Sequence, residues 1–432
     1  MSVSGEAVIA ADAADDSASA PGERSWVLTL GFSHALVHGT ELTYAALLLR
    51  IEAEFGTDLL LLGILANVGA FAFGLGALPS GFLVDRVGSV RVLRITLGSA
   101  AIAALIVGLS VNEVMLGATL AFLGIATGLY HPAGFALLAR TRRPSRNVGI
   151  HGAVGVLGIA GAPAVATGLA IATDWRVAYF LLAALALAGF LYTLRLDPRG
   201  PASVRAAAKR SAAAAGRPDA AASPATRARP QITPWVPLLL VYLAFMTSGF
   251  IFRGAITFIP THVEEEITFS IFGWEGAALA GALSTLALLG GAVGWFVGGH
   301  ASDAYPREWF VLGMSFAIVP LLLFISVASG ALLLLAIFLF VIATFAIAPA
   351  LVTLVADYSP PGHLGASYGV TFFASFGVGS FAATLAGFSA GQWGTDSVFA
   401  LLAAVAMIGV ALAGALVLMA RRAEPATAPT PA

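Results

Sequence analysis

The sequence predicts an all-α membrane protein with twelve transmembrane helices in two pseudo-symmetric six-helix bundles. Three observations support this prediction: the composition, the spacing of the apolar runs, and an internal repeat. Of the 432 residues, 59% are hydrophobic and 10% are charged, and the mean hydropathy is +0.92. So few charges cannot cover the surface of a soluble globular protein. The composition therefore indicates a chain that lies in a lipid bilayer.

The apolar runs match the length of a membrane span, which needs about 20 mostly apolar residues. The first half of the chain contains six such runs, at residues 26–49, 59–84, 92–110, 114–139, 148–172 and 175–194. The second half contains six more, at residues 235–260, 276–300, 309–328, 331–356, 364–390 and 397–420. We therefore expect an N-terminal bundle over residues 26–194 and a C-terminal bundle over residues 235–420.

Three polar segments flank and separate these bundles. Residues 1–25 are acidic and rich in Ala and Ser and lack the basic start of a signal peptide, so we expect a disordered tail. Residues 195–234 are rich in Ala, Pro, Arg and Ser and carry eight basic residues against two Asp. This composition predicts a flexible cytoplasmic linker. Residues 421–432 form the C-terminal tail.

The basic residues predict the orientation, because loops on the cytoplasmic side of a membrane carry an excess of Arg and Lys. With the linker and both termini inside, all but three of the 22 basic residues lie on the cytoplasmic side. Arg50 and Arg176 lie outside, and Arg253 lies within a span. We expect a multi-pass protein of the cell (inner or plasma) membrane with both termini cytoplasmic.

The second half of the chain repeats the first. A charged turn between two apolar runs begins at Gly81 and contains Asp85, and the same spacing returns at Gly299 and Asp303, at an offset of 218 residues. The Gly31-Phe32 pair returns as Gly249-Phe250 at the same offset. Parallel six-helix repeats with a substrate site between them are a known plan of membrane transporters, so the duplication favours alternating access.

The first copy of the turn, with Gly81, Asp85, Arg86, Gly88 and Arg91, resembles motif A of the major facilitator superfamily of transporters. The second copy keeps Asp303 and Arg307 but has Ala304 where an Arg would follow the Asp. The resemblance implies the major facilitator fold. It also implies a gate in which Asp85 caps the helix that begins near residues 364–367 and pairs with an arginine of the motif in the outward-open state.

Three further stretches narrow the resemblance. Ser33-His34, the segment 128–134 with its His131-Pro132 step, and the turn 361–365 are similar to the fosmidomycin resistance protein branch of multidrug and antibiotic efflux carriers. The chain departs from that branch at Val37-His38, where the branch has Asn-Asp, and at Glu41, where it has Gln. The resemblance therefore implies that Glu41 or His38 carries the proton here.

Ionisable groups inside a span are costly, so they are candidates for function. His34, His38 and Glu41 lie at positions i, i+4 and i+7 of the first span, within about 60° of arc on one helix face. We interpret them as the proton-coupling residues. A structural polar network is the plain alternative, and a zinc site is a second one, because His at i and i+4 with a nearby carboxylate can bind zinc.

Three more ionisable residues lie in later spans. Arg253 is expected either to meet Glu41 across the two halves or to bind an anionic group of the substrate. His131 is expected to line the substrate cavity, or else to occupy a helix break at Pro132 with its ring bonded to freed carbonyl groups. His151 is expected at the membrane interface.

The span 148–172 has a face of small residues that includes Gly152, Gly155 and Gly158. With Pro163, this face partly resembles motif C of antiporters in the superfamily, although Ala162 alters the Gly-Pro dipeptide. Close helix packing explains such a face equally well.

We therefore predict a secondary active transporter that works by alternating access, a proton-coupled exporter (antiporter) of a small organic or drug-like molecule. A proton symporter for uptake of an organic acid or sugar is the alternative. An intramembrane metalloenzyme is a third hypothesis, but no His-Glu-x-x-His motif occurs, and we expect no enzyme. The expected partners are a small-molecule substrate, protons and the lipid bilayer. We expect no cofactor, no metal and no nucleic acid, and a monomer.

Overall fold

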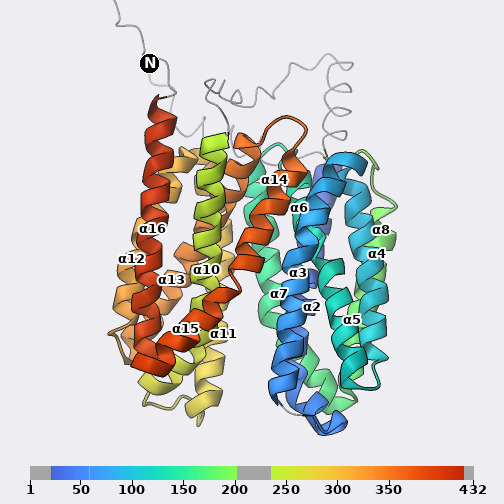
Figure 1. Cartoon of the computed structure of the whole chain (residues 1–432), viewed down its shortest axis with the longest axis vertical. Helices are drawn as coiled ribbons and strands as arrows, with labels where there is room; N and C mark the ends of the chain where they lie inside the picture. Colours follow the sequence, from blue (N-terminus) through green and yellow to red (C-terminus); the bar gives the residue numbers. More distant parts are fainter. Residues whose placement is uncertain (1–20, 58, 202–234, 423–432) are drawn as a thin grey trace, which may run out of the picture.

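The computed structural model describes residues 21–57, 59–201 and 235–422, and these residues form twelve helical rods that run side by side (Figure 1). The first-half rods are α2 (Pro21–Phe55), α3 (Leu59–Val87), α4 (Ser89–Gly108), α5 with α6 (Glu113–Gly128 and Tyr130–Leu138), α7 (Pro144–Ala172) and α8 (Trp175–Thr193). The second-half rods are α10 (Trp235–Glu266), α11 (Gly276–Ala304), α12 (Arg307–Ile325), α13 (Gly330–Tyr358), α14 with η1 and α15 (Leu364–Phe372, Phe373–Val378 and Phe381–Trp393), and α16 (Thr395–Arg422). The predicted all-α membrane fold is confirmed.

Eleven of the described helices are long and apolar enough to cross a membrane, and α2 is the rod that does not meet this criterion. The reason is its content of ionisable groups, since His34, His38 and Glu41 all lie in the middle of α2. The least apolar rod is thus the one that carries the candidate proton-coupling residues.

The first helix begins earlier than the sequence predicts. We expected a tail up to residue 25, but α2 begins at Pro21. Glu23 in its first turn is buried and accepts hydrogen bonds from the backbone N–H of Arg142 (3.1 Å) and from Asn147 Nδ2 (3.4 Å). These bonds attach the turn to the loop before α7 and to the beginning of α7 itself. The remaining tail and most of the linker (residues 1–20, 202–234 and 423–432) lie outside the described residues.

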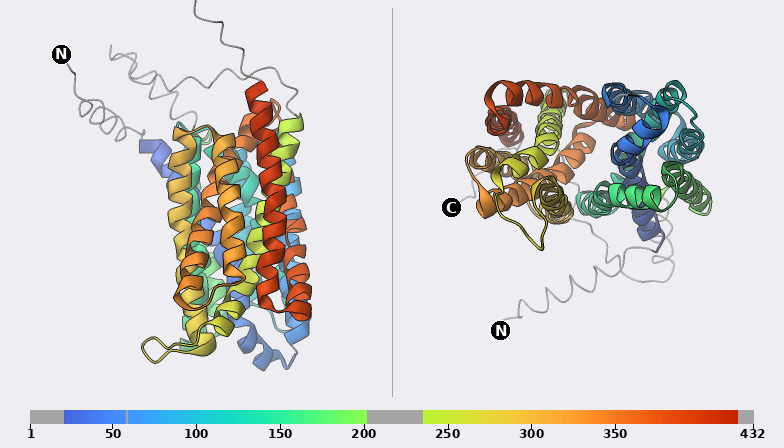
Figure 2. Two further views of the ribbon diagram at one scale, coloured as in Figure 1. Left: turned by 90° about the vertical axis from the view of Figure 1, so that its left-hand side faces the viewer. Right: turned by 90° about the horizontal axis from the view of Figure 1, so that it is seen from below.

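The duplicated sequence folds into a duplicated structure. In the first half α2 packs on α7, α3 on α5, and α4 on α8. In the second half the corresponding contacts join α10 to α15 and η1, α11 to α13, and α12 to α16. Figure 2 shows the two halves as separate groups of helices when the molecule is viewed along the rods.

The halves meet along two seams, in which α3 packs on α14 and α7 packs on α11. Both seams depend on glycine. A Cβ atom on Gly81 would lie 2.5 Å from the Gly365 carbonyl oxygen, and one on Gly299 would lie 2.8 Å from the Cα of Gly149. The backbones of the two halves therefore touch directly, as small residues allow in membrane helices. The glycines at positions 81 and 299 are repeat partners, so the two seams are equivalent.

We predict that Gly81→Ala separates the halves at this seam without unfolding them. The new methyl group overlaps backbone atoms of α14, and overpacking of this kind costs about 1–3 kcal/mol. Gly313→Ala on α12 is the matched control, because nothing lies within 4 Å of its added Cβ. The chain has no cysteine, so spin labels at Arg140→Cys and His363→Cys measure the separation by pulsed electron paramagnetic resonance. An unchanged distance distribution in Gly81→Ala would contradict the prediction.

Candidate functional site

Four histidines from three helices of the first half form one buried group, which we call the histidine cluster. It consists of His34 and His38 from α2, His131 from α6 and His151 from α7. The rings of His34 and His151 stack at 4.1 Å between centroids, and the His131 ring lies 5.3 Å from each of the rings of His34 and His38. The sequence placed three of these residues in the site but missed His151. The expectation that His151 lies at the membrane interface is wrong, because its side chain is buried and its ring stacks on that of His34 in the interior of α2.

The glycines of α7 make room for this cluster. A Cβ atom on Gly155 would lie 2.2 Å from His34 Nδ1, and one on Gly158 would lie 2.0 Å from the Ala35 carbonyl oxygen. Any side chain at these two positions would push α2 away. The small-residue face therefore serves helix packing over this stretch, and it lets the His34 ring lie directly against α7.

The break between α5 and α6 places His131. α5 ends at Gly128 and α6 begins at Tyr130. The carbonyl of Leu129 accepts a 2.6 Å hydrogen bond from the Ser80 hydroxyl, so Ser80 serves this carbonyl in the break. His131 is 2% exposed, and its Nδ1 has no hydrogen-bond partner among the described residues. A polar atom of the cluster is therefore buried and available to a ligand.

The hydrogen bonds within the cluster determine which ring nitrogens carry protons. His34 Nδ1 lies 3.3 Å from the carbonyl oxygen of His151, which can only accept, so this nitrogen donates. In a neutral ring His34 Nε2 then accepts from His38 Nε2, at 3.0 Å. His38 Nδ1 faces Glu41 Oε2 at 3.4 Å, and these two atoms need one additional proton between them. The network is therefore built to hold one dissociable proton.

Arg253 of α10 approaches this network from the second half. Its Nη1 lies 3.6 Å from Glu41 Oε1, and the Arg253 and Glu41 side chains are 36% and 17% exposed. The structure thus brings together the two residues that the sequence predicted to face each other. The same carboxylate meets His38 through one oxygen and Arg253 through the other, so it links the histidine cluster to the opposite half.

Aromatic rings of the second half cover the cluster, and the sequence did not predict them. The rings of Phe372 and Phe376 lie 4.8 and 5.1 Å from the His131 ring. Phe376 belongs to the π-helical turn η1, an arrangement that is frequent at functional sites. Gly377 and Gly379 are the feature of the sequence that could have indicated this irregular turn, because glycine allows the backbone to depart from α-helical geometry.

We call the end of the molecule at which α8 ends and α10 begins the linker end. It carries the turn with Asp85 that resembles motif A. Asp85 accepts hydrogen bonds from the backbone N–H groups of Gly365 (2.7 Å) and Ala366 (2.8 Å) in the first turn of α14. Those groups have no partner within their own helix, and the helix dipole favours a negative charge there. Gly88, at φ +91°, allows the turn that follows.

The resemblance to motif A implies that Asp85 pairs with an arginine of the motif. No such pair is present among the residues that the structure describes. Arg86 is exposed and forms no hydrogen bond or ion pair with described residues. Arg91 donates to the Val87 carbonyl at 3.5 Å. The helix cap at α14 satisfies the Asp85 carboxylate instead.

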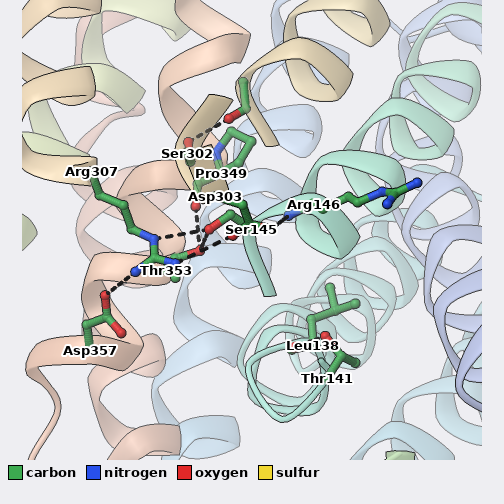
Figure 3. A network of polar contacts seen from close by, with 11 residues as sticks. Leu138, Thr141, Ser145, Arg146, Ser302, Asp303, Arg307, Pro349, Thr353 and Asp357 are labelled. Atoms are coloured by element: carbon green, nitrogen blue, oxygen red, sulfur yellow. Dashed lines mark hydrogen bonds and ion pairs between the residues drawn. The ribbon is translucent and has the colours of Figure 1, made fainter. Parts of the chain in front are cut away.

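The second copy of the turn forms the equivalent contact. Asp303 accepts a 3.1 Å hydrogen bond from the backbone N–H of Arg146 in the first turn of α7. Figure 3 shows that polar contacts continue around it. Arg307 binds Ser145 Oγ (3.2 Å), Asp357 (3.0 Å) and Asp303 (3.5 Å). Each half thus presents one Asp to a helix N-terminus of the other.

Comparisons with known proteins agree with this architecture. A family model described as the Major Facilitator Superfamily matches residues 30–280 and 241–432. A search of curated proteins finds no significant match. The narrower resemblance to the fosmidomycin resistance branch stays a prediction.

Solved structures with the same fold include three transporters. The human organic anion transporter MFSD10 is 17% identical, with a TM-score of 0.70 over 91% of this chain and 100% of that one. FucP in the outward conformation is 14% identical, with a TM-score of 0.68 over 90% and 98%. The proton:xylose symporter XylE, bound to 6-bromo-6-deoxy-D-glucose, is 14% identical, with a TM-score of 0.67 over 90% and 94%. At these identities the likeness shows the fold alone.

We predict that Asp85→Asn weakens the contact between the halves at the linker end. The amide keeps the shape but loses the charge and one acceptor, which costs about 1–2 kcal/mol at a helix N-terminus. This corresponds to a roughly 5- to 30-fold larger open population. Ser145→Cys, buried in the other seam, reports opening by its rate of thiol labelling.

The matched control for this experiment is Asp396→Asn. Asp396 also lies in the first turn of a helix, α16, but it is exposed and belongs to none of the four helices that form the seams. If labelling of Ser145→Cys were equally slow with Asp85, Asp85→Asn and Asp396→Asn, the gating role of Asp85 would be excluded.

Proposed function

The chain belongs to the Major Facilitator Superfamily, and we propose that it is a proton-coupled transporter that carries a small organic anion by alternating access. The observation that supports this proposal is the ion pair between Glu41 and Arg253, which lies between the two halves and is connected to the histidine cluster through His38. One carboxylate therefore takes part in both a proton-binding network and a contact that changes when the halves move.

Protonation of Glu41 is the step that couples the two events. While Glu41 is ionised, the Arg253 guanidinium is paired with it, and an anionic substrate must compete for the same cation. A proton taken up between His38 and Glu41 neutralises the carboxylate and leaves Arg253 available to a carboxylate or phosphate group of the substrate. Proton and anion then bind together, so the arrangement supports co-transport.

The linker end supplies the gate. Asp85 and Asp303 each cap a helix of the opposite half, and the glycine seams close the space between them. If the linker is cytoplasmic, as the distribution of basic residues indicates, the closed gate faces the cytoplasm. Loss of these two caps would accompany the rocking motion that opens the linker end and exposes Glu41 and Arg253 to that side of the membrane.

An exporter that exchanges protons for substrate, as the sequence predicts, is the second candidate. Exchange requires the substrate and the proton to compete for one group, as a cationic substrate would compete for the Glu41 carboxylate. The observation in its favour is the segment around Pro163 of α7, where nothing lies within 4 Å of a Cβ on Gly161. Packing against α2 does not explain the glycine at position 161.

Proteoliposomes with an imposed pH gradient test the proposal. The protein is reconstituted and exposed to a panel of organic acids, sugars and drug-like cations, while a pH-sensitive dye in the lumen records proton movement. Co-transport acidifies the lumen when an external anion enters. Lumen alkalinisation on entry of an external compound would indicate exchange, and the absence of proton movement with every transported compound would refute proton coupling.

We predict that Glu41→Gln abolishes gradient-driven accumulation but retains exchange of substrate across the membrane. The amide resembles the protonated carboxyl group, so Arg253 stays available at every pH and no proton is released. The measurement compares counterflow of labelled substrate with uphill uptake. His300→Gln, a histidine of α11 outside the cluster, is the control. Full gradient-driven uptake by Glu41→Gln would move the proton site to a histidine.

We predict that Arg253→Ala weakens substrate binding roughly 10- to 100-fold, because a hydrogen bond to a charged group contributes about 1.5–3 kcal/mol. Arg253→Lys should have a smaller effect, since it keeps the charge but loses the two-pronged geometry. Binding is measured by isothermal calorimetry. If Arg253→Ala instead lowers the melting temperature and the added Glu41→Ala restores it, the arginine is a structural partner of Glu41.

A further inference from the structure

We propose that His34, His38 and His131 form a binding site for a transition-metal ion, with Zn²⁺ as the ion whose coordination chemistry fits them best. One ring nitrogen of each of these three residues lies within 4.8 Å of the other two. The site shares residues with the proton-binding network, but metal coordination by these three rings does not require the protein to transport anything.

Two of the three histidines are already oriented as metal ligands are. A metal-bound histidine commonly donates its other ring N–H to a carbonyl or carboxylate oxygen, which holds the ring in place. His34 Nδ1 faces the His151 carbonyl oxygen (3.3 Å), and His38 Nδ1 faces Glu41 Oε2 (3.4 Å). Their Nε2 atoms lie 3.0 Å apart. With His38 Nδ1 protonated, a metal ion would displace the proton that His38 Nε2 donates in the metal-free network, and both Nε2 lone pairs would then meet at one place.

The third histidine provides the independent observation. His131 is 2% exposed, and its Nδ1 lacks a hydrogen-bond partner in the described part of the chain. A buried nitrogen of this kind is costly unless something binds it. The aromatic rings of Phe372 and Phe376 beside it offer no acceptor or strong donor. A metal ion shared with His34 and His38 would satisfy this residue.

Distances and ligand type favour zinc. Three neutral imidazoles suit Zn²⁺, and Zn–N bonds of about 2.0–2.1 Å in a tetrahedral site place ligand nitrogens about 3.3 Å apart. The separations in the cluster, from 3.0 Å up to 4.8 Å, bracket that value, so small rotations of the rings suffice. Three protein ligands leave the fourth position to water. The ion would replace the hydrogen bond between His34 and His38.

The experiment measures zinc binding to the purified full-length protein in detergent, after removal of any affinity tag. Calorimetry and metal analysis after gel filtration should give one Zn²⁺ per chain, and Co²⁺ in its place should show the visible absorption of a tetrahedral site. His131→Ala should weaken binding by roughly tenfold or more. His300→Ala, whose Nδ1 bonds the Phe296 carbonyl on α11, should bind as the unchanged protein does.

Zinc binding is also measured for His34→Asn. Each protein is melted in the absence of metal to show that it is folded. His131→Ala leaves a cavity beside Phe372 and Phe376 and is expected to melt below the parent protein, so zinc binding is compared at temperatures at which all the variants are folded. Equal zinc affinity in the parent protein, His131→Ala and His34→Asn would overturn the proposal, as would a parent protein that binds no zinc. No pH gradient or substrate is present, so this result is independent of the transport assay: zinc binding without proton coupling would refute only the proposed function.

Discussion

The contact between a carboxylate of one half and a helix N-terminus of the other is the interaction on which the rest of the structure depends. Asp85 caps α14 and Asp303 caps α7. A contact of this type contributes about 0.5–2 kcal/mol, which is enough to favour one arrangement of the halves and small enough to be broken repeatedly. The glycine seams at Gly81 and Gly299 bring the carboxylates within reach, because only bare backbones allow the helices to approach so closely.

The interior of the molecule follows a different rule. Polar groups at the linker end can exchange partners with water, whereas those of the histidine cluster must find partners within the protein. His34, His38 and Glu41 do so in a chain of hydrogen bonds, which an ion pair between Glu41 and Arg253 connects to the other half. A change in charge at Glu41 therefore alters the contact between the halves, and motion of the halves alters the surroundings of Glu41. This reciprocity is the physical basis of the proposed coupling.

Local pattern and tertiary packing contributed differently to the site. Three features follow directly from the sequence. The lengths of the apolar runs give the positions of the twelve rods, the repeated spacing gives the duplication at 218 residues, and the helical period places His34, His38 and Glu41 on one face. The facing of Glu41 and Arg253 could be inferred from the repeat symmetry. The burial of His151 could not, because it depends on how α2 and Tyr130 pack over α7. The aromatic cover from Phe372 and Phe376 depends likewise on the π-helical turn η1.

Hydrophobic length and helical periodicity are properties of neighbouring residues. The amino-acid sequence is therefore enough to identify a duplicated helical membrane protein and the rod that carries its ionisable groups. The packing of the helices in three dimensions sets which oxygens the Nδ1 atoms of His34 and His38 face. It also brings Arg307 to Ser145, Asp303 and Asp357 and places the glycines of α7 against the His34 ring. The contacts of His34 with His151 and of Arg307 with Ser145 join residues more than a hundred positions apart. Their distances are set by the packing of whole helices, which no local pattern of residues records.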